Sequence, residues 1–450
     1  MDRLISRTVE KRRPLSVHFD LTFRCNERCV HCYLDHDDHG ELTTAECIAV
    51  MEDLARAGTL FLTFSGGEIF LRPDLFEILA AARRLHFDIS LKTNALLVTK
   101  ERVARLREFG VRRVQISVYS DIPEVHDAIT KVSGSLGRTL AAIPLLLEQD
   151  LQVKLACPLM KENLLAYRGV MALAEKLGIP YVLDLTITPM MDGSAGPLAH
   201  RASVSSLLPV LQESALHGCK PQPHAGVDGA VERSLASLGS TVSSGIESSA
   251  YEDLPCSAGH NSCYISPYGD VFPCVQLPQA AGNVRRERFS DIWYHAPELE
   301  RLRGIRESHL PVCSRCEIRS YCERCPGLAL MEGGDLLGAY ERACELAEQK
   351  ARLAGVFNPV SALHKGRTAA ASYATSGAKS LLLWQTLVQT EGIHRMPDDK
   401  KAPQTPGEIG GKKPYTKPSV VSEPIYETLA LACGKLPGQG GFCGASPKRS

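Results

Sequence analysis

Cys25, Cys29 and Cys32 stand close together in the spacing C-x3-C-x2-C, directly after an apolar stretch. Iron-sulfur clusters in proteins are normally held by four cysteine thiolates. Three thiolates would therefore leave one iron free to bind a reactant, much as catalytic zinc keeps an open position. Two other interpretations stay open at this point. One is a zinc site that His36 or His39 completes, and the other is a set of ordinary buried cysteines.

A second cysteine-rich region lies in the C-terminal half. Twelve residues separate its first cysteine from Gly269, and four more separate that glycine from the third cysteine. The next four cysteines follow the spacing C-x2-C-x5-C-x2-C. Eight cysteines are enough for two complete four-thiolate clusters, although zinc in one or both places is the alternative. They are Cys256, Cys263, Cys274, Cys313, Cys316, Cys322, Cys325 and Cys344.

Length and composition limit the class of protein. The chain has 450 residues and predicts more than one domain. Lys+Arg and Asp+Glu both total 51, so no net positive charge favours nucleic acid as a partner. No segment approaches the ~18 consecutive apolar residues of a membrane span, and the N-terminus has no apolar signal region. We therefore expect a cytoplasmic protein, whose 16 cysteines indicate metal rather than disulfides.

The elements that must position the first cysteines alternate between strand and helix. A capping box at Thr43 and Glu46 begins one of the helices. Regular alternation predicts an α/β fold with right-handed parallel crossovers. Strands are expected at 15–23, 60–64, 88–92, 113–118, 151–156 and 181–185, and helices at 43–57, 73–85, 100–109, 136–148 and 164–177.

Ligands of parallel sheets bind beyond the carboxyl ends of the strands, and polar residues stand at three of these ends. Gly66, Gly67 and Glu68 follow the second strand, where glycine allows close backbone approach and the carboxylate could bind a cation. Asn94 follows the third strand, and Ser117 lies near the end of the fourth. Plain turn or capping residues are the alternative interpretation.

The cysteine triplet, with His31 and Tyr33 around its third member, resembles the signature of radical S-adenosylmethionine (radical SAM) enzymes. In that family the open iron of a [4Fe-4S] cluster binds SAM, and its reduction yields a 5′-deoxyadenosyl radical. The resemblance implies a partial (β/α)6 barrel, expected over 1–215, and an electron donor such as flavodoxin or ferredoxin. It also implies SAM contacts from His31, Gly66, Gly67, Glu68, Asn94 and Ser117.

The order of the eight later cysteines resembles the SPASM domain, which holds two auxiliary clusters in radical SAM enzymes that modify peptides or proteins. We expect this domain over 256–364, after a Gly- and Ser-rich linker at 216–255. Many SPASM domains have three residues, not two, between the last pair of the central run. The resemblance assigns Cys256, Cys263, Cys274 and Cys325 to one cluster and Cys313, Cys316, Cys322 and Cys344 to the other.

The end of the chain has a different composition. A linker at 365–411 precedes residues 412–450, where a patterned stretch leads to a Gly-rich segment with Cys433 and Cys443. This order resembles a ribosomally made precursor peptide with its leader first and its core last. Leader peptides are often captured by strand addition to a sheet edge. A disordered tail, or two thiols that bind metal or oxidise together, is the alternative.

These features predict a radical SAM enzyme that matures a peptide, with Cys433 and Cys443 as candidate substrates of a thioether or other crosslink. Cys157, at the end of the fifth strand, is a candidate hydrogen donor if it faces the barrel interior. Burial as a small apolar residue is the alternative. Two other functions stay open: maturation of a separate protein or peptide-derived cofactor, as in sulfatase-maturating relatives, and electron transfer without catalysis.

Overall fold

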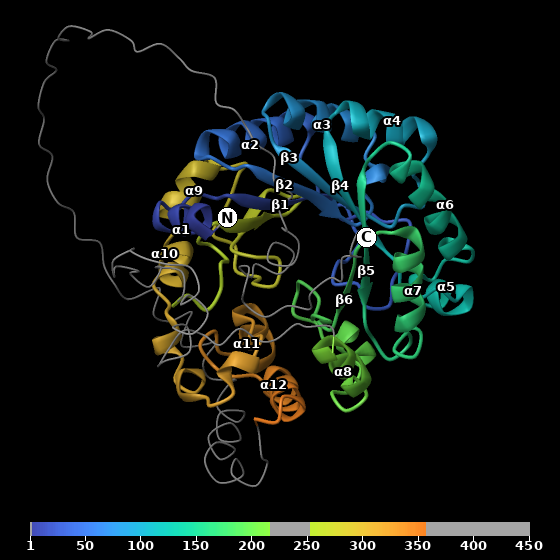
Figure 1. The fold of residues 1–450 in the computed structure, drawn as a ribbon. Coiled ribbons are helices and arrows are strands. Elements are labelled where there is room, and N and C mark those ends of the chain that lie inside the picture. The colour runs from blue at the N-terminus through green and yellow to red at the C-terminus, as the bar shows by residue number, and fades with distance from the viewer. Residues whose placement is uncertain (1, 217–252, 357–450) are drawn as a thin grey trace, which may run out of the picture.

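The computed structural model describes residues 2–216 and 253–356, which form one curved sheet with helices around its outer rim (Figure 1). The sheet has nine strands in this part of the chain, in the order β6-β5-β4-β3-β2-β1-β7-β8-β9. The predicted linker at 365–411 and the tail at 412–450 lie outside the described residues, as does most of the segment at 216–255. The strands are β1 (Ser16–Thr22), β2 (Phe61–Gly66), β3 (Asp88–Thr93), β4 (Val111–Ser117), β5 (Gln152–Pro158), β6 (Tyr181–Asp184), β7 (Ser262–Ile265), β8 (Asp270–Phe272) and β9 (Gly282–Asn283).

Strands β1 to β6 are parallel neighbours joined by helices, which confirms the predicted α/β partial barrel. The predicted capping box is present, because Glu46 N donates to Thr43 Oγ1 and Thr43 N donates to the Glu46 carboxylate. Gly58 then ends the helix in the left-handed conformation. The helices are α1 (Asp2–Glu10), α2 (Thr44–Ala57), α3 (Leu75–Arg84), α4 (Lys100–Glu108), α5 (Pro123–Thr130), α6 (Ser135–Leu147), α7 (Tyr167–Leu177), α8 (Leu208–Leu216), α9 (Phe289–His295), α10 (Pro297–Arg303), α11 (Pro326–Gly333) and α12 (Glu341–Leu353).

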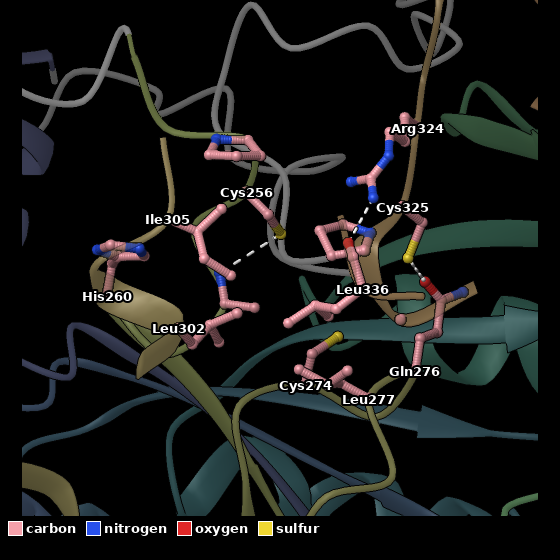
Figure 2. A pocket seen from close by; sticks show the side chains of 14 residues that line it. Cys256, His260, Cys274, Gln276, Leu277, Leu302, Ile305, Arg324, Cys325 and Leu336 are labelled. Carbon is pink, nitrogen blue, oxygen red and sulfur yellow. Dashed lines mark hydrogen bonds between the residues drawn. The ribbon is translucent and has the colours of Figure 1, made fainter. Parts of the chain in front are cut away.

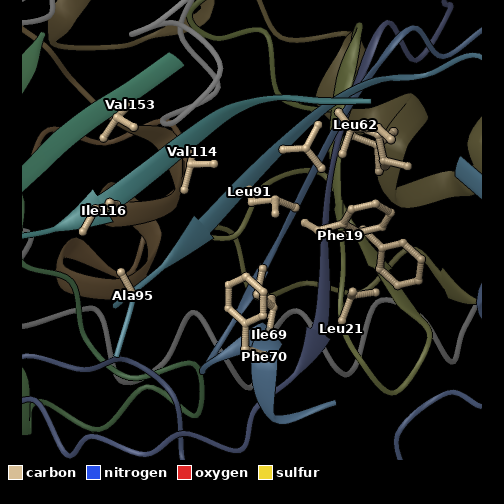
Figure 3. Close-up of a cluster of buried hydrophobic side chains, with 14 of the residues drawn as sticks. Phe19, Leu21, Leu62, Ile69, Phe70, Leu91, Ala95, Val114, Ile116 and Val153 are labelled. Carbon is tan, nitrogen blue, oxygen red and sulfur yellow. The ribbon is translucent and has the colours of Figure 1, made fainter. Parts of the chain in front are cut away.

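Alternate residues of each strand build the hydrophobic core. Phe19, Phe64, Leu91 and Ile116 are almost completely buried against the helix layer, and Figure 3 shows how such side chains from neighbouring strands lie together. Burial of this apolar surface is the main driving force for folding. Because side chains alternate along a strand, the residues in between lie on the opposite, concave face.

The concave face is polar. Lys92, Gln115 and Lys154 are half-buried residues of β3, β4 and β5, and the register pairs Lys92 with Gln115 and Gln115 with Lys154. On β1, Asp20 is fully buried and accepts hydrogen bonds from Tyr264 Oη and His18 Nε2, each at 2.9 Å. The barrel therefore presents charged and amide side chains on the face that its helices do not cover.

The sheet continues into the second cysteine-rich region. β7 pairs in parallel with β1, and β8 and β9 add antiparallel strands at 270–272 and 282–283. Tyr264 and Ile265 of β7 pair with Phe272 and Val271 of β8. The predicted barrel and the region after residue 256 share one sheet, because β1 pairs with β2 on one side and with β7 on the other.

A half-buried ion pair also joins the two regions. Arg201 donates to both carboxylate oxygens of Glu332, at 2.6 and 2.7 Å, and its Nε donates to Ile187 O at 2.8 Å. Both side chains of the pair are about 15% exposed. The pair fixes α11 against the segment that follows β6. No helix in the described residues is long and apolar enough to cross a membrane.

The Arg201→Met variant should be less stable by about 2 to 3 kcal/mol, since it leaves the half-buried Glu332 carboxylate without its bidentate donor. Urea unfolding under anaerobic conditions measures this difference. Arg168→Met is the matched control, because Arg168 pairs with Glu213 at a solvent-exposed site and should contribute less than about 1 kcal/mol. Equal effects of the two variants would contradict the structural role of the Arg201 pair.

His126 should make stability depend on pH. Burial lowers its pKa from 6.5 to about 4, and its Nδ1 accepts a hydrogen bond from Tyr119 N. Below pH 6.5 the unfolded state binds the proton more readily, so stability falls as pH decreases. Between about pH 8 and about pH 5.5 the wild type should lose about 1.4 kcal/mol more than His126→Asn, which keeps an acceptor. Parallel urea titrations of both proteins at the two pH values test this, and identical losses would contradict it.

Candidate active site and cluster-binding sites

Cys25, Cys29 and Cys32 lie on one loop at the carboxyl end of β1. The loop is held to the end of α5, because Arg28 N donates to Thr130 O and Val30 N donates to Ile129 O, both at 3.0 Å. Sequence reasoning missed α5, an eight-residue helix that begins at Pro123. These hydrogen bonds hold the backbone of the loop that carries the three cysteines.

The environment of these thiols is buried and acidic. Burial raises the pKa of Cys25 to about 12, and the charge of Cys32 contributes to the shift. Burial likewise raises the pKa of Cys29 well above its usual value, and the charges of Glu27, Cys32 and Cys25 contribute. The three sulfur atoms thus lie within electrostatic reach of one another. A bound cation reverses this preference, because a coordinating thiol loses its proton.

Glu27, which lies within the loop, and Tyr119, which follows β4, contact Cys29 and were not indicated by the sequence. The Cys29 Sγ donates to Glu27 Oε2 at 3.4 Å and lies 3.5 Å from Tyr119 Oη. Burial raises the pKa of Glu27 to about 7, and its Oε1 has no hydrogen-bond partner in the described part of the chain. A buried polar atom without a partner is costly, so this oxygen fits a site that a bound group completes.

Gly66 and Gly67 pack directly against the start of the cysteine loop. Gly66 has a φ of +128°, and a Cβ there would lie 2.0 Å from Thr22 O. A Cβ at Gly67 would lie 2.3 Å from Arg24 O. The Gly67 and Glu68 amides donate to Thr22 O and Arg24 O at 2.8 and 2.9 Å. Only glycine fits these two positions, and the backbone contact fixes the loop against β2.

Glu68 is fully buried and holds the ends of β2 and β3 together. Its carboxylate accepts hydrogen bonds from Thr93 Oγ1 at 2.8 Å, Asn94 N at 2.9 Å and Phe70 N at 3.1 Å. Burial raises the pKa of Glu68, and these donors oppose the shift. The side chain is thus engaged within the protein. A direct contact of Glu68 with the amino group of SAM stays a prediction from the family resemblance.

Asn94, His31 and Ser117 lie at the same end of the sheet. The Asn94 Nδ2 donates to Asn26 Oδ1 at 2.7 Å and lies 3.9 Å from Cys25 Sγ. His31 packs edge-on against Tyr119, and burial lowers its pKa to about 4, so the ring is neutral at physiological pH. Its Nδ1 has no partner among the described residues. Ser117 is half-buried at the end of β4. Their contacts with SAM stay predictions.

Cys157 does not face the barrel interior. It belongs to the main hydrophobic core together with Val153 and Leu155 of the same strand, and it is completely buried. Asn163 Nδ2 donates to its sulfur at 3.6 Å. The expectation of an inward thiol is therefore corrected, because the alternation along β5 turns this residue toward the helices. The structure gives no support for hydrogen donation by Cys157.

Four of the later cysteines lie near one another, on two short turns and α12. They are Cys313, Cys316, Cys322 and Cys344. Burial raises the pKa of Cys344 to about 12, and the charges of Cys322, Cys313 and Cys316 contribute. Cys313 is buried, and Cys344 lies on α12. This proximity supports the four residues as one cluster site. The ligand assignment itself stays a prediction.

Three further cysteines line a separate pocket (Figure 2). They are Cys256, Cys274 and Cys325, and apolar residues such as Leu277 and Leu302 form much of the remaining wall. The Cys325 Sγ donates to the Gln276 side-chain oxygen at 3.2 Å. Cys263 was predicted to belong to this set, but it does not line the pocket.

None of the thirteen cysteines in the described residues forms a disulfide with another of them. No three His, Cys, Asp or Glu side chains in residues 2–216 and 253–356 are gathered closely enough to hold a metal ion. The fit to iron-sulfur clusters therefore rests on the chemistry of the donors. It rests on thiols that share one loop or one pocket, on the unpartnered Glu27 Oε1, and on the glycine backbone that packs beside the first loop.

Comparisons with known proteins agree with this geometry. Residues 20–173 match the radical SAM superfamily, and residues 256–317 match SPASM, an iron-sulfur cluster-binding domain. An AdoMet-dependent heme synthase of Methanosarcina barkeri is 31% identical over 336 residues, which cover 72% of this chain and 94% of the relative. A mycofactocin maturase, MftC of Mycobacterium ulcerans, is 29% identical over 309 residues, which cover 64% of this chain and 77% of the relative.

The fold has known counterparts as well. The crystal structure of Streptococcus suis SuiB bound to the precursor peptide SuiA superimposes with a TM-score of 0.57, at 17% identity, and covers 76% of this chain and 79% of SuiB. The chain belongs to the radical SAM enzymes that carry a SPASM domain. Its cofactors are SAM, the SAM-binding [4Fe-4S] cluster and auxiliary iron-sulfur clusters. The predicted family, fold, enzyme class and cofactors are confirmed.

Gly67→Ala should strongly reduce SAM binding and iron content at the first site, because the added Cβ would overlap Arg24 O and displace the cysteine loop. Gly137→Ala is the matched control: Gly137 lies in α6 with no atom within 4 Å of the added Cβ, and alanine favours a helix by up to about 1 kcal/mol. Iron analysis and SAM titration of both anaerobic proteins check this expectation. A Gly67→Ala protein with full iron and normal SAM affinity would disprove the packing argument.

Proposed function

We propose that this radical SAM enzyme matures a peptide, and that the peptide is its own C-terminal segment at 412–450. One observation carries the proposal: the same chain contains a radical SAM domain, a SPASM domain and a precursor-like segment with two cysteines. The tail lies outside the described residues, so its part in the proposal comes from sequence. A relative named mycofactocin maturase, and a structural neighbour that was crystallised with a precursor peptide, add support.

The leading product is a thioether from Cys433 or Cys443 to a carbon atom of the same segment. SAM bound to its cluster and reduced by a donor such as flavodoxin or ferredoxin would release methionine and supply a 5′-deoxyadenosyl radical, which would take one hydrogen atom from that carbon. Formation of the carbon-sulfur bond would release the thiol proton and one surplus electron, which an oxidised auxiliary cluster would accept. Each bridge therefore removes two hydrogens from the peptide and releases one 5′-deoxyadenosine.

The chain's own residues would orient the substrate on the concave face of the barrel. Lys92, Gln115 and Lys154 stand side by side there, and their amide and ammonium groups can bind peptide carbonyl or carboxylate oxygens. β6 is the outer strand of the barrel in the described residues, so strand addition of a leader peptide at this edge is available. We also propose a cytoplasmic location, since a reducing compartment keeps the 16 cysteines of the chain as thiols that can bind clusters.

A second candidate function is heme synthesis, which the 31% identical relative favours. The two lysines on the concave face suit this function too, because porphyrins bind through carboxylate side chains that ammonium groups can pair with. Maturation of a separate protein also stays open as a variant of the peptide proposal. The mass of the tail should change if the peptide is the substrate, and the mass of an added porphyrin should change if heme synthesis is the function.

The full-length protein should lose about 2 Da per thioether bridge after anaerobic incubation with SAM and reductant. Intact-mass and fragment-mass analysis would place the loss within 412–450, with one 5′-deoxyadenosine released per bridge. Cys433→Ala combined with Cys443→Ala should abolish the mass loss, whereas Cys219→Ala is the thiol-removal control and should leave it intact. Replacement of Cys25, Cys29 and Cys32 by alanine should abolish both products.

An unchanged tail mass with both thiols still open to alkylation would refute the self-modification proposal. If an iron porphyrin added to the same reaction changed mass while the tail did not, heme synthesis would replace it. A mass loss that depends on protein concentration would show that the tail reacts in a neighbouring molecule. A loss independent of concentration would show reaction within one chain.

A further inference from the structure

We propose that His18 and Asp20, on the concave face of β1, take up the proton that the substrate thiol releases when the carbon-sulfur bond forms. His18 is the proton acceptor, and Asp20 is the positioning residue that orients it. The inference rests on the proposed peptide maturation, because thioether formation is the step that releases a thiol proton. An iron-sulfur cluster can take the surplus electron, but the proton needs an acceptor among the side chains.

His18 and Asp20 form a hydrogen-bonded pair. Val17, Phe19 and Leu21 of the same strand belong to the helix-side core, so alternation turns His18 and Asp20 to the concave face. The His18 Nε2 lies 2.9 Å from Asp20 Oδ1, and Asp20 is completely buried. Because an ionised carboxylate only accepts hydrogen bonds, this contact places the ring proton on Nε2. The lone pair of the imidazole is then on Nδ1.

The Nδ1 atom of His18 is the atom that can receive a proton. It has no hydrogen-bond partner among the described residues, and 13% of the His18 side chain is exposed, whereas Asp20 is not exposed at all. Burial and the charge of Lys92 lower the pKa of His18, and the charge of Asp20 opposes them. The ring is therefore neutral at physiological pH. Once protonated, it gains a charge that the Asp20 carboxylate stabilises.

Neighbouring strands hold the pair in place. Tyr264 of β7 donates to the second carboxylate oxygen of Asp20 at 2.9 Å, and its ring packs edge-on against His18 with centroids 5.5 Å apart. The register sets Thr63 of β2, which does not titrate, opposite His18. The charged and titratable groups near His18 are therefore Asp20 of β1, Tyr264 of β7 and Lys92 of β3. Lys92 is also one of the side chains proposed to orient the substrate.

The pair lies near both cysteine sites. Burial raises the pKa of Cys32 in the first cysteine loop, and the charge of Asp20 contributes. Burial also raises the pKa of Tyr33, and the charges of Asp20, Cys32 and Cys274 contribute. Cys274 lines the second pocket. Asp20 is therefore within electrostatic reach of the first loop, and Tyr33 is within reach of Asp20 and of both cysteine sites. A proton released between these sites has the pair as a nearby acceptor.

The proton transfer completes the balance of the proposed reaction. Hydrogen abstraction leaves a carbon radical beside a thiol that still carries its proton. The proton moves to His18 Nδ1 as the carbon-sulfur bond forms, and the surplus electron passes to an oxidised auxiliary cluster. His18 later returns the proton to water. Proton transfer to a positioned side chain typically accelerates such a step by about 100-fold or more.

His18→Gln tests the proton acceptor, because glutamine keeps a donor for Asp20 but cannot take up a proton. The full-length variant, incubated anaerobically with SAM and reductant, should still release 5′-deoxyadenosine but should form bridges about 100-fold more slowly. The amount of 5′-deoxyadenosine released per bridge should therefore rise. Asp20→Asn should act in the same way, since its amide can donate to Nε2 and move the ring proton to Nδ1. His295→Gln, at an exposed site on α9, is the matched control.

The pH profile separates a proton acceptor from a structural side chain. The wild-type bridge rate should fall in acid, as His18 becomes protonated below its ordinary pKa of 6.5, and His18→Gln should lack this fall. If both variants formed bridges at the wild-type rate, or if His18→Gln kept the same fall, this proposal alone would be overturned. A wild-type tail that never loses mass would instead overturn the proposed function, and the proton acceptor with it.

Discussion

The fold of the active site depends on one close contact between two stretches of backbone. Gly66 and Gly67 lie against Thr22 and Arg24 with no room for a side chain, and the amides of Gly67 and Glu68 donate hydrogen bonds to Thr22 O and Arg24 O, where the cysteine loop begins. Glu68 then turns inward and binds donors at the end of β3. The loop with the three cysteines, the glycine segment and Asn94 are therefore one rigid unit. A cluster and its ligand can be placed accurately only because this unit cannot slide.

Much of this unit could be predicted from the sequence because its signals are local. Three signals each depend on residues a few positions apart: the spacing of the cysteine triplet, the adjacent glycines and the capping box at Thr43. The alternation of strand and helix then predicts that the triplet and the glycines lie at the same edge of the sheet. Glu27 and Tyr119 could not be predicted. Glu27 lies inside the cysteine loop, but its contact with Cys29 depends on how the loop folds. Tyr119 is far from Cys29 in sequence, and α5 helps to hold it there through His126; no local pattern indicates where that short helix packs.

Cys157 and Cys263 show a second limit of sequence reasoning. Each lies on a strand whose two faces are both largely buried, one by helices and one within the barrel. The alternation of apolar and polar residues, which reveals the core face of an exposed strand, is weak in such strands. Both residues belong to the helix-side core, and the sheet register, which only the structure shows, decides their orientation. Spacing between cysteines carries no information on that choice.

Charge links the C-terminal clusters to the stability of their own region. Arg319 is paired with Glu307, and Arg324 keeps one buried nitrogen without a partner in the part of the chain that the structure describes. The charges of both lower the pKa of the Cys313 thiol, although burial outweighs them and raises it overall. A buried guanidinium nitrogen without an acceptor is costly, and a nearby anionic cluster removes that cost. Cluster loading should thus stabilise the cysteine-rich region, since binding to a site absent from the unfolded chain adds directly to folding free energy.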